Sequence, residues 1–248
     1  MTRHLLITGG SRGIGAATAR LAAQRGDRVA ITYQRQGDAA DALVAAIQAA
    51  GGQAMALQVD VADETQVLDL FARLDRVWGR LDGLVNNAGV VDVAARVEDM
   101  SMARWRRLFD TNVLGAFACA REAVRRMSTR HGGAGGAIVN VSSMAARLGA
   151  ANQYVDYAST KAAIETFTLG LAHEVAPDGI RVNAVRPGVI DTDIHASGGQ
   201  PDRARRLAPA IPMQRPGTAD EVAHAICWLL SDEASYTTGS VLDVGGGR

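Results

Sequence analysis

The sequence Leu5-Leu6-Ile7-Thr8-Gly9-Gly10-Ser11-Arg12-Gly13-Ile14-Gly15 joins a short apolar run to a glycine-rich loop. Residues 5–8 predict a buried strand, and residues 16–24 predict a helix. Glycine permits a tight turn, and backbone N–H groups can then approach a phosphate at the helix N-terminus. The G-x-x-x-G-x-G spacing differs from the G-x-G-x-x-G fingerprint of dinucleotide-binding turns, and the alternative is an ordinary glycine-containing loop. The strand–loop–helix context favours a pyrophosphate-binding turn made by Gly9, Ser11, Arg12, Gly13, Ile14 and Gly15.

The same alternation of apolar strands and helices continues along the chain. Further strands are predicted at residues 28–33, 54–59, 83–86, 137–142, 180–185 and 241–244. Helices are predicted at residues 38–50, 64–78 and 219–230, in a segment ending near 175, and at 102–130 with a break near Thr111-Asn112. Apolar strands without polar alternation predict a parallel sheet covered on both faces. The expected α/β fold is a doubly wound, Rossmann-type three-layer sandwich with a mostly or fully parallel seven-stranded sheet, forming one domain over residues 1–248.

Composition limits the class of protein. The 248 residues are 48% apolar with formal net charge +0, which supports a sizeable core and predicts neither nucleic-acid nor membrane partners. No apolar stretch reaches the ~18 residues that span a bilayer, and no signal-peptide pattern is present, so a cytoplasmic protein is expected. The five histidines are scattered, so no metal site is predicted. Cys119 and Cys227 lie in apolar helical contexts and are expected to be reduced core residues.

The predicted second strand ends in Tyr33-Gln34-Arg35. In a doubly wound sheet this position contacts the adenosine ribose, where an acid binds both hydroxyls and a basic group favours a 2′-phosphate. Arg35 stands there without a carboxylate, and Arg12 in the glycine loop can reach the same place. The sequence therefore predicts NADP(H) in preference to NAD(H), with Tyr33 and Arg35 in contact. The alternative is a merely solvated Arg35, with NAD(H) as the cofactor.

Tyr157 and Lys161 lie four residues apart in a segment with helical spacing, so both project from one helix face. Tyrosine, with an ordinary pKa near ~10, is a poor acid or base at neutral pH, and a neighbouring positive charge favours its phenolate. The pair is therefore a candidate proton-transfer device. Alone, a Y-x-x-x-K pattern is more typical of a solvated helix face.

Six short motifs extend this pattern over the whole chain in a fixed order. They are Thr8-Gly9-x-x-x-Gly13-x-Gly15, Asn86-Asn87-Ala88-Gly89, Asn112, Val141-Ser142-Ser143, Tyr157-x-x-x-Lys161 and Pro187-Gly188. With these motifs the chain resembles the short-chain dehydrogenase/reductase family, in its compact single-domain branch. The resemblance implies NAD(P)-dependent oxidation of an alcohol or reduction of a carbonyl group.

The resemblance also implies roles for single residues. Tyr157 is the acid/base that protonates the carbonyl oxygen in reduction, and Lys161 lowers its pKa and hydrogen-bonds the nicotinamide ribose. A serine ending the fifth strand polarises the carbonyl, and Asn112 interrupts its helix and holds a water in a proton relay. Further cofactor contacts are expected from Asp60 and Val61 at the adenine, from Asn87, Ala88 and Gly89 in the crevice, and from Pro187, Gly188, Ile190 and Thr192 at the carboxamide end.

Two adjacent serines compete for the polarising role. Strand alternation places Ser142 and Ser143 on opposite faces. The family usually uses the second serine of such a pair, so the resemblance assigns Ser143. Its separation from Tyr157 is fourteen residues, about one longer than the commonest family spacing.

The resulting hypothesis is an NADP(H)-dependent oxidoreductase that transfers a hydride between the nicotinamide and a small carbonyl or alcohol substrate. Within it, 3-oxoacyl thioester reduction and sugar or polyol oxidation both remain open. The alternative from another class is a non-catalytic NAD(P)-sensing protein on the same fold. The complete set of Asn112, Ser143, Tyr157 and Lys161 argues against a sensor, which needs no proton relay.

Substrate contacts are expected from residues 90–95, 144–154 and 190–211. The last segment is long and punctuated by Gly and Pro, which is typical of a mobile substrate lid. Its three arginines, Arg203, Arg205 and Arg206, either bind an acidic substrate or lie on a solvated helix face.

Oligomer formation is expected from the resemblance alone. Family members of this length pair through the helices that carry Asn112 and Tyr157 and often form tetramers. A homotetramer, or a dimer, is therefore expected. Small residues in the second of these helices suit either close helix contact or packing on the sheet: Ala162, Ala163, Gly170 and Ala172.

Overall fold

The structure, a computed structural model, describes residues 2–248. One sheet contains the strands β1 (His4–Ile7), β2 (Arg28–Tyr33), β3 (Gln53–Gln58), β4 (Gly83–Asn86), β5 (Gly136–Val141), β6 (Ile180–Pro187) and β7 (Val241–Val244). Their order is β3-β2-β1-β4-β5-β6-β7, and every neighbouring pair is parallel. The predicted doubly wound parallel sheet is confirmed, and each strand begins and ends within two residues of its expected position.

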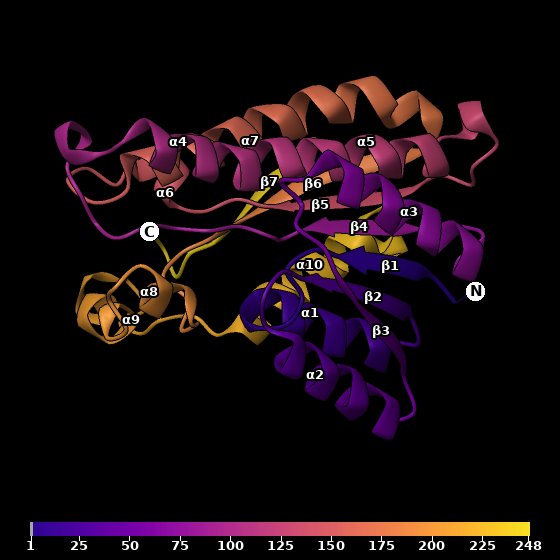
Figure 1. The fold of residues 1–248 in the computed structure, drawn as a ribbon, viewed down its shortest axis with the longest axis horizontal. Helices are drawn as coiled ribbons and strands as arrows, with labels where there is room; N and C mark the ends of the chain where they lie inside the picture. Colours follow the sequence, from indigo (N-terminus) through magenta and orange to yellow (C-terminus); the bar gives the residue numbers. More distant parts are fainter. Residues whose placement is uncertain (1) are drawn as a thin grey trace.

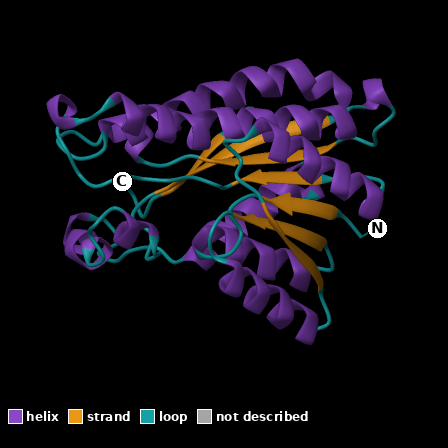
Figure 2. Cartoon of the chain, viewed as in Figure 1, coloured by secondary structure: helices purple, strands orange, loops and turns teal. Residues whose placement is uncertain are grey.

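Helices cover both faces of this sheet (Figures 1 and 2). One face packs against α1 (Gly13–Gln24), α2 (Gly37–Ala49) and α10 (Ala219–Leu230), and the other against α3 (Glu64–Trp78), α5 (Gly115–Met127) and α7 (Val155–Val175). Strand side chains alternate between the two cores: Leu5 and Ile7 of β1 lie in the first, and Leu6 in the second. Because both faces are buried, the strands appear in the sequence as continuous apolar runs.

The helix expected over residues 102–130 is divided. It consists of α4 (Met102–Phe109), a π-helical turn at Asp110–Leu114 and α5, with a 3₁₀ turn at Thr129–His131. The expected break near Thr111-Asn112 is confirmed, and its form is a π-helix. Such turns are rare and occur frequently at functional sites.

The 190–211 segment has more regular structure than the sequence predicts. It contains α8 (Ile194–Ser197), α9 (Arg203–Leu207) and a 3₁₀ turn at Ala208–Ala210. These elements, orange in Figure 1, lie beyond the carboxyl ends of the strands. Val189, Ala204 and Ile211 hold them through a small apolar cluster separate from the two main cores. Helices this short show no clear apolar periodicity, so the sequence predicts no helix in this segment.

The strand order reverses at β1, whose neighbours are β2 on one side and β4 on the other. Successive crossovers therefore leave on opposite faces, and a crevice opens at the carboxyl ends of β1 and β4. The glycine loop after β1 and residues 87–89 after β4 both lie at this point. Parallel-sheet proteins bind their ligands in this crevice.

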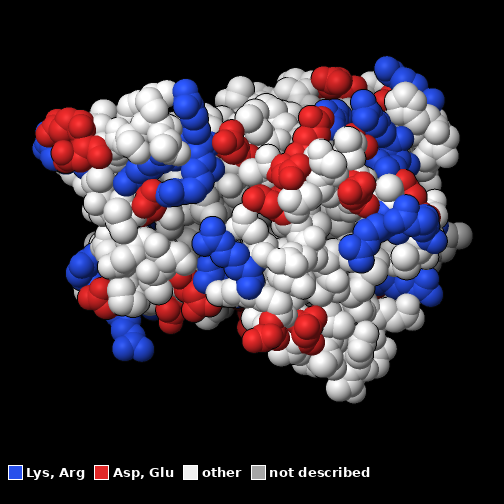
Figure 3. All heavy atoms as spheres, in the orientation of Figure 1, with Lys and Arg blue, Asp and Glu red and all other residues white. Residues whose placement is uncertain are grey.

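The surface carries charges of both signs. On the face shown in Figure 3, Lys and Arg side chains are interspersed with Asp and Glu, in keeping with the net charge of +0. Over residues 2–248, no helix combines the length and the apolarity needed to cross a membrane. Cys119 and Cys227 are free and buried, as expected, and burial raises their thiol pKa values to about 12 and about 11.

Candidate active site

The glycine turn after β1 has the geometry of an anion-binding loop. Gly9 adopts a φ of +63°, and a Cβ there would lie 2.8 Å from the Cα of Ala88, so only glycine fits. Helix α1 begins at Gly13, and its N-cap residue Arg12 makes no side-chain capping bond. The first N–H groups of the helix therefore remain available to a ligand, and the helix dipole favours an anion there. These features fit the pyrophosphate of a dinucleotide.

The loop after β4 is tied to this turn. The Asn87 side chain donates through Nδ2 to the carbonyl oxygens of Thr8 (2.9 Å) and Gly9 (2.8 Å). The Thr8 hydroxyl in turn accepts from the backbone N–H groups of Asn87 and Ala88, both at 3.0 Å. Asn87 and Gly89 line the cavity described below, whereas Ala88 packs against the turn. The two loops thus form one preorganised wall.

The adenosine end of the crevice lies where β2 and β3 finish. Tyr33 is half-buried and Arg35 is exposed. Gln34 donates through Nε2 to Oδ2 of Asp60 at 2.6 Å, and Val61 is buried beside it. The only carboxylate brought to the end of β2 in these contacts is therefore already hydrogen-bonded, and Arg35 remains free to meet an anion.

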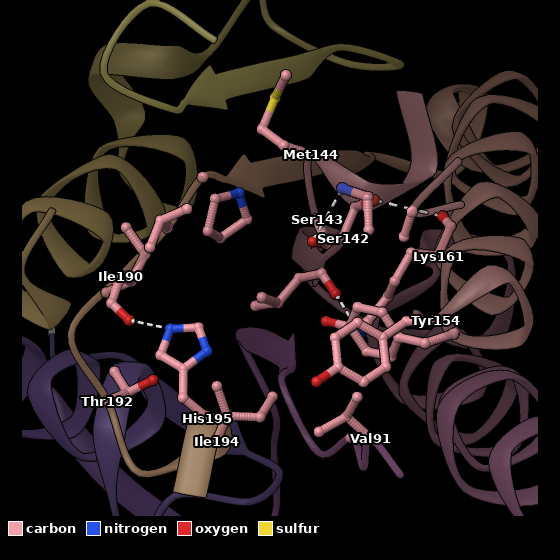
Figure 4. A pocket seen from close by; sticks show the side chains of 18 of the residues that line it. Val91, Ser142, Ser143, Met144, Tyr154, Lys161, Ile190, Thr192, Ile194 and His195 are labelled. Carbon is pink, nitrogen blue, oxygen red and sulfur yellow. Dashed lines mark hydrogen bonds between the residues drawn. The ribbon is translucent and has the colours of Figure 1, made fainter. Parts of the chain in front are cut away.

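A cavity of about 310 Å³ opens from the crevice toward the 190–211 segment. Figure 4 shows its two walls: Ser142, Ser143 and Lys161 lie on one side, and Ile190, Thr192 and His195 on the other. The predicted site residues in its lining are Ile14, Asn87, Gly89, Ser143, Tyr157, Lys161, Pro187, Gly188, Ile190 and Thr192. The remaining predicted residues form the turn and the adenosine end, or lie behind the lining. The predicted substrate segments contribute Val91, Met144, Leu148, Tyr154, Ile194 and Leu207.

The Tyr157 phenol lies in this cavity beside Ser143. Burial raises the pKa of Tyr157, and the neighbouring Ser143 hydroxyl and the Arg203 charge oppose that rise. Lys161 places Nζ 5.7 Å from the Tyr157 ring centroid. In this structure burial has the largest effect on the tyrosine pKa, and the lowering of that pKa by Lys161 stays a prediction. The phenol is protonated at neutral pH, as tyrosine ordinarily is, and this is the form that can donate a proton.

Lys161 is the only lysine among the 26 basic residues of the chain. It is 5% exposed, and its Nζ donates to the carbonyl oxygen of Val141 at 2.8 Å. Burial lowers the pKa of Lys161 from its ordinary 10.5 to about 8. A neutral amine is accessible at this pKa, so Lys161 can both hold and release a proton near physiological pH.

Replacing this buried ammonium with an apolar side chain is expected to stabilise the fold. A pKa lowered from 10.5 to about 8 corresponds to a penalty on the order of 3 kcal/mol. The penalty is fully present below pH 8 and fades as pH rises toward 10.5, since the unfolded chain then also loses the proton. Lys161→Met should therefore raise the free energy of unfolding by about 2 kcal/mol at pH 7, after loss of one hydrogen bond.

Urea unfolding of both proteins at pH 7 and pH 10 measures this difference. The advantage of the variant should shrink at the higher pH, and an advantage that does not change with pH would contradict the lowered pKa. Because the chain has one lysine, a ¹⁵N-lysine label also gives a single side-chain signal whose titration reports that pKa directly.

Asn112 lies in the π-helical turn and is 1% exposed. Its Oδ1 accepts from the N–H of Val90 (2.7 Å), and its Nδ2 donates to Val90 O (2.9 Å) and to Thr160 Oγ1 (3.1 Å). A Cβ built on Gly89 would lie 3.4 Å from both Asn112 Oδ1 and Lys161 Nζ. The π-turn therefore brings the amide next to the lysine and joins the β4 loop to α7.

Two buried anchors that sequence reasoning missed hold the helix of Tyr157. Arg104 binds Asp156 in a bidentate ion pair (2.6 and 3.2 Å), and Asp156 also accepts from the backbone N–H of Tyr157. These residues lie 52 positions apart, and each looks like an ordinary surface charge in the sequence. The start of α7 is thereby fixed to α4, directly beside the phenol.

Ser142 and Ser143 both border the cavity, but their hydroxyls have different partners. Ser143 lines the cavity beside Tyr157. Ser142 is 2% exposed and donates to Glu165 Oε1 at 2.6 Å, while Arg186 clamps the same carboxylate at 2.7 and 2.8 Å. Ser142 therefore ties β5 to α7, and Ser143 is the serine with access to a ligand.

The opposite wall belongs to the 190–211 segment. Ile190 forms a parallel bridge with Gly217, and its carbonyl oxygen accepts from Nε2 of His195 at 2.9 Å. Because a carbonyl only accepts, Nε2 carries the proton and Nδ1 is left as an acceptor. Arg12 of the glycine loop donates to Ser197 at 3.3 Å, so in this structure its guanidinium reaches α8.

Comparison with known proteins gives consistent matches over the whole chain. A family model described as enoyl-(acyl carrier protein) reductase matches residues 9–248. The uncharacterized oxidoreductase YgfF of Escherichia coli is 55% identical over 243 residues, which are 98% of each chain. The cis-4-hydroxycyclohexanecarboxylate dehydrogenase of Sinomonas cyclohexanicum is 40% identical, covering 99% of this chain and 96% of its own.

A solved structure agrees in fold. The short-chain dehydrogenase of Burkholderia cenocepacia in complex with NADP superposes with a TM-score of 0.90 at 35% identity, covering 99% of this chain and 97% of its own. At this level of identity and coverage, the likeness extends to the sequence as well as to the fold.

Proposed function

Since this chain belongs to the short-chain dehydrogenase/reductase family and is an oxidoreductase, we propose that it reduces a small carbonyl compound with NADPH, or oxidises the corresponding alcohol with NADP⁺. The observation that carries the proposal is the convergence of Ser143, Tyr157 and Lys161 on one largely apolar cavity beside the glycine turn. When bound, the nicotinamide supplies or accepts the hydride. The protein residues hold the substrate and move the proton.

In the reduction direction, the Tyr157 hydroxyl donates its proton to the carbonyl oxygen. The Ser143 hydroxyl and the Arg203 charge beside the phenol oppose the rise of its pKa and so favour proton release. Ser143 donates a hydrogen bond to the same oxygen and stabilises the negative charge that develops there. The largely apolar lining strengthens both interactions.

Lys161 and Asn112 are assigned to proton transfer and to cofactor binding. We assign to Lys161 a hydrogen bond to the nicotinamide ribose, and its pKa of about 8 suits a group that passes on a proton. Asn112 links the β4 loop to α7, because its side chain donates to both Val90 and Thr160. Through this placement it fixes the position of any water beside Lys161.

The NADP(H) preference is proposed from the end of β2. Arg35 is exposed there, and the neighbouring carboxylate of Asp60 accepts a hydrogen bond from Gln34. The guanidinium is thus available to pair bidentately with a 2′-phosphate. The dinucleotide is otherwise held by the glycine turn, Asn87, Ala88, Gly89, Val61, Pro187, Gly188, Ile190 and Thr192.

Arg35→Ala is expected to weaken NADPH binding by roughly 10- to 100-fold, the value of a charged hydrogen-bond pair, and to leave NADH binding unchanged. Fluorescence titration of both cofactors measures the change. Arg73→Ala, an exposed arginine on α3, is the matched control and should bind both as the wild type does. If Arg35→Ala weakened NADH binding as much as NADPH binding, the proposed 2′-phosphate contact would be contradicted.

We propose that residues 190–211 form a substrate lid on the single domain. Their short helices rest on a three-residue apolar cluster, Val189, Ala204 and Ile211, and they face the cavity with Ile194, His195 and Leu207. Weakly buried segments of this kind open at low cost. The apolar lining favours a substrate with a hydrocarbon body over a polyol.

An NADPH-consumption screen tests the proposed function. Ketones, cyclic ketones, 3-oxoacyl thioesters, quinones and sugars are compared by absorbance at fixed protein concentration. Ketones with a compact hydrocarbon body should be reduced, and sugars should not. Failure of every carbonyl class, with NADPH bound, would overturn the proposal.

A homotetramer, built from dimers that pair through α4, α5 and α7, is proposed for the assembly. Phe109, Leu114 and Leu169 on these helices are exposed. Gly170 faces open space and Ala172 is buried in the sheet core, so the small residues of α7 divide between the two roles. Light scattering on the purified protein measures the assembly, and a monomer would contradict it.

A further inference from the structure

Arg203 of α9 lies in the cavity wall on the substrate side. Its Nη2 donates to Oε1 of Gln153 at 3.1 Å, and its guanidinium carbon lies 5.3 Å from the centre of the Tyr154 ring. Its charge also acts on Tyr157 and opposes the rise of the Tyr157 pKa that burial causes. Arg205 and Arg206 of the same helix are exposed. The three arginines therefore differ: one enters the cavity and two face solvent.

The Arg203 guanidinium makes few hydrogen bonds and no ion pair in the part of the chain that the structure describes. Its Nε is buried and has no hydrogen bond, and within residues 2–248 no carboxylate forms an ion pair with it. The charged side chains that affect it most are Arg248 and Arg206, both of its own sign, and burial lowers the pKa of Arg203. A half-buried cation without a counter-charge has a desolvation penalty that no attraction offsets.

Three other guanidinium groups that are buried or half-buried have partners within the protein. Arg104 has the bidentate carboxylate of Asp156, and Arg186 has that of Glu165. Arg181 donates to the backbone carbonyl oxygens of Leu229 and Ser231 (2.7 and 3.0 Å). Arg203 departs from this pattern, and it lies in the lining of the candidate substrate cavity.

The neighbours of Arg203 hold it in place. Gln200 donates to the Tyr154 hydroxyl at 2.7 Å, and Arg206 donates to the side-chain oxygen of Gln200. Tyr154 is 6% exposed, so its ring is a fixed platform for the guanidinium stacked on it. The cation is thus prepositioned, and among the described residues its Nη1 donates no hydrogen bond.

We propose that the substrate carries a carboxylate at the end away from its reacting carbonyl, and that Arg203 binds this carboxylate. A guanidinium edge offers two parallel N–H donors that match the two oxygens of a carboxylate. The apolar lining between Arg203 and Tyr157 accommodates the hydrocarbon body, so the substrate class is an oxo acid or the corresponding hydroxy acid. The inference rests on the proposed function, since it takes Tyr157 as the reacting end.

A ladder of oxo acids tests the inference. We would measure kcat/KM for 4-oxopentanoate, 5-oxohexanoate and 6-oxoheptanoate, each against its methyl ester, with NADPH. The wild type should prefer one acid over its ester, and Arg203→Met should lower that preference by roughly 10- to 100-fold. Arg203→Lys should keep part of it, and Arg205→Met, on the exposed side of α9, should match the wild type. An unchanged acid-to-ester preference in Arg203→Met would overturn the inference.

A binding measurement separates this inference from the proposed function. Calorimetry with pentanoate, hexanoate and heptanoate, each compared with its amide, is run with and without NADP⁺ and needs no turnover. Acid-selective binding that Arg203→Met removes supports the carboxylate site even if no ketone is reduced. Equal binding of acid and amide, or no binding of any acid by the wild type, overturns it.

Discussion

Tyr157→Phe is expected to lower kcat for carbonyl reduction by about 10³- to 10⁴-fold, the contribution of a well-placed general acid. The variant removes one hydroxyl from a half-buried ring and leaves the glycine turn, Asn87 and Lys161 in place. Cofactor affinity should therefore change by less than about twofold. Single-turnover absorbance measures the rate, and fluorescence titration measures NADPH binding.

A matched control is available in the same chain. Tyr236 is 103% exposed, so Tyr236→Phe makes the same chemical change on the surface and should leave kcat and cofactor binding as in the wild type. Turnover that survives Tyr157→Phe would remove Tyr157 from its role as the acid. Loss of NADPH binding in that variant would instead indicate a disturbed cavity.

Ser143→Ala is the second large expected effect. Removal of one donor to a developing oxyanion lowers kcat by about 10²- to 10³-fold. Ser142→Ala is the neighbouring comparison, because its hydroxyl bonds to Glu165 and to the Lys161 carbonyl instead of the cavity. In that variant the free energy of unfolding should fall by ~1 kcal/mol, and kcat should fall by less than about tenfold. The reverse order of effects on kcat would transfer the polarising role to Ser142.

Local sequence predicts the parts of this protein that depend on neighbouring residues. The strand–turn–helix at residues 5–24 is local, since the glycines, the apolar run and the helix follow one another in the chain. The seven strands and the break near Asn112 were predicted for the same reason.

Contacts between residues that are distant in the chain could not be predicted from the sequence. The ion pair of Arg104 with Asp156 and the clamp of Arg186 on Glu165 span 52 and 21 positions, and nothing local marks either pair. The sequence left two interpretations for Arg203, and only the packing of α9 against Tyr154 turns its guanidinium inward. Burial of Tyr157, which raises its pKa, cannot be read from a Y-x-x-x-K spacing.

The two walls of the cavity are anchored unequally. The α7 wall is fixed by the buried pairs of Arg104 with Asp156 and of Arg186 with Glu165, whereas α8 and α9 rest mainly on three apolar side chains. Substitutions in residues 190–211 can therefore reshape the recognition surface without displacing Tyr157 or Lys161. We therefore expect directed evolution toward new substrates to have most freedom in α8 and α9.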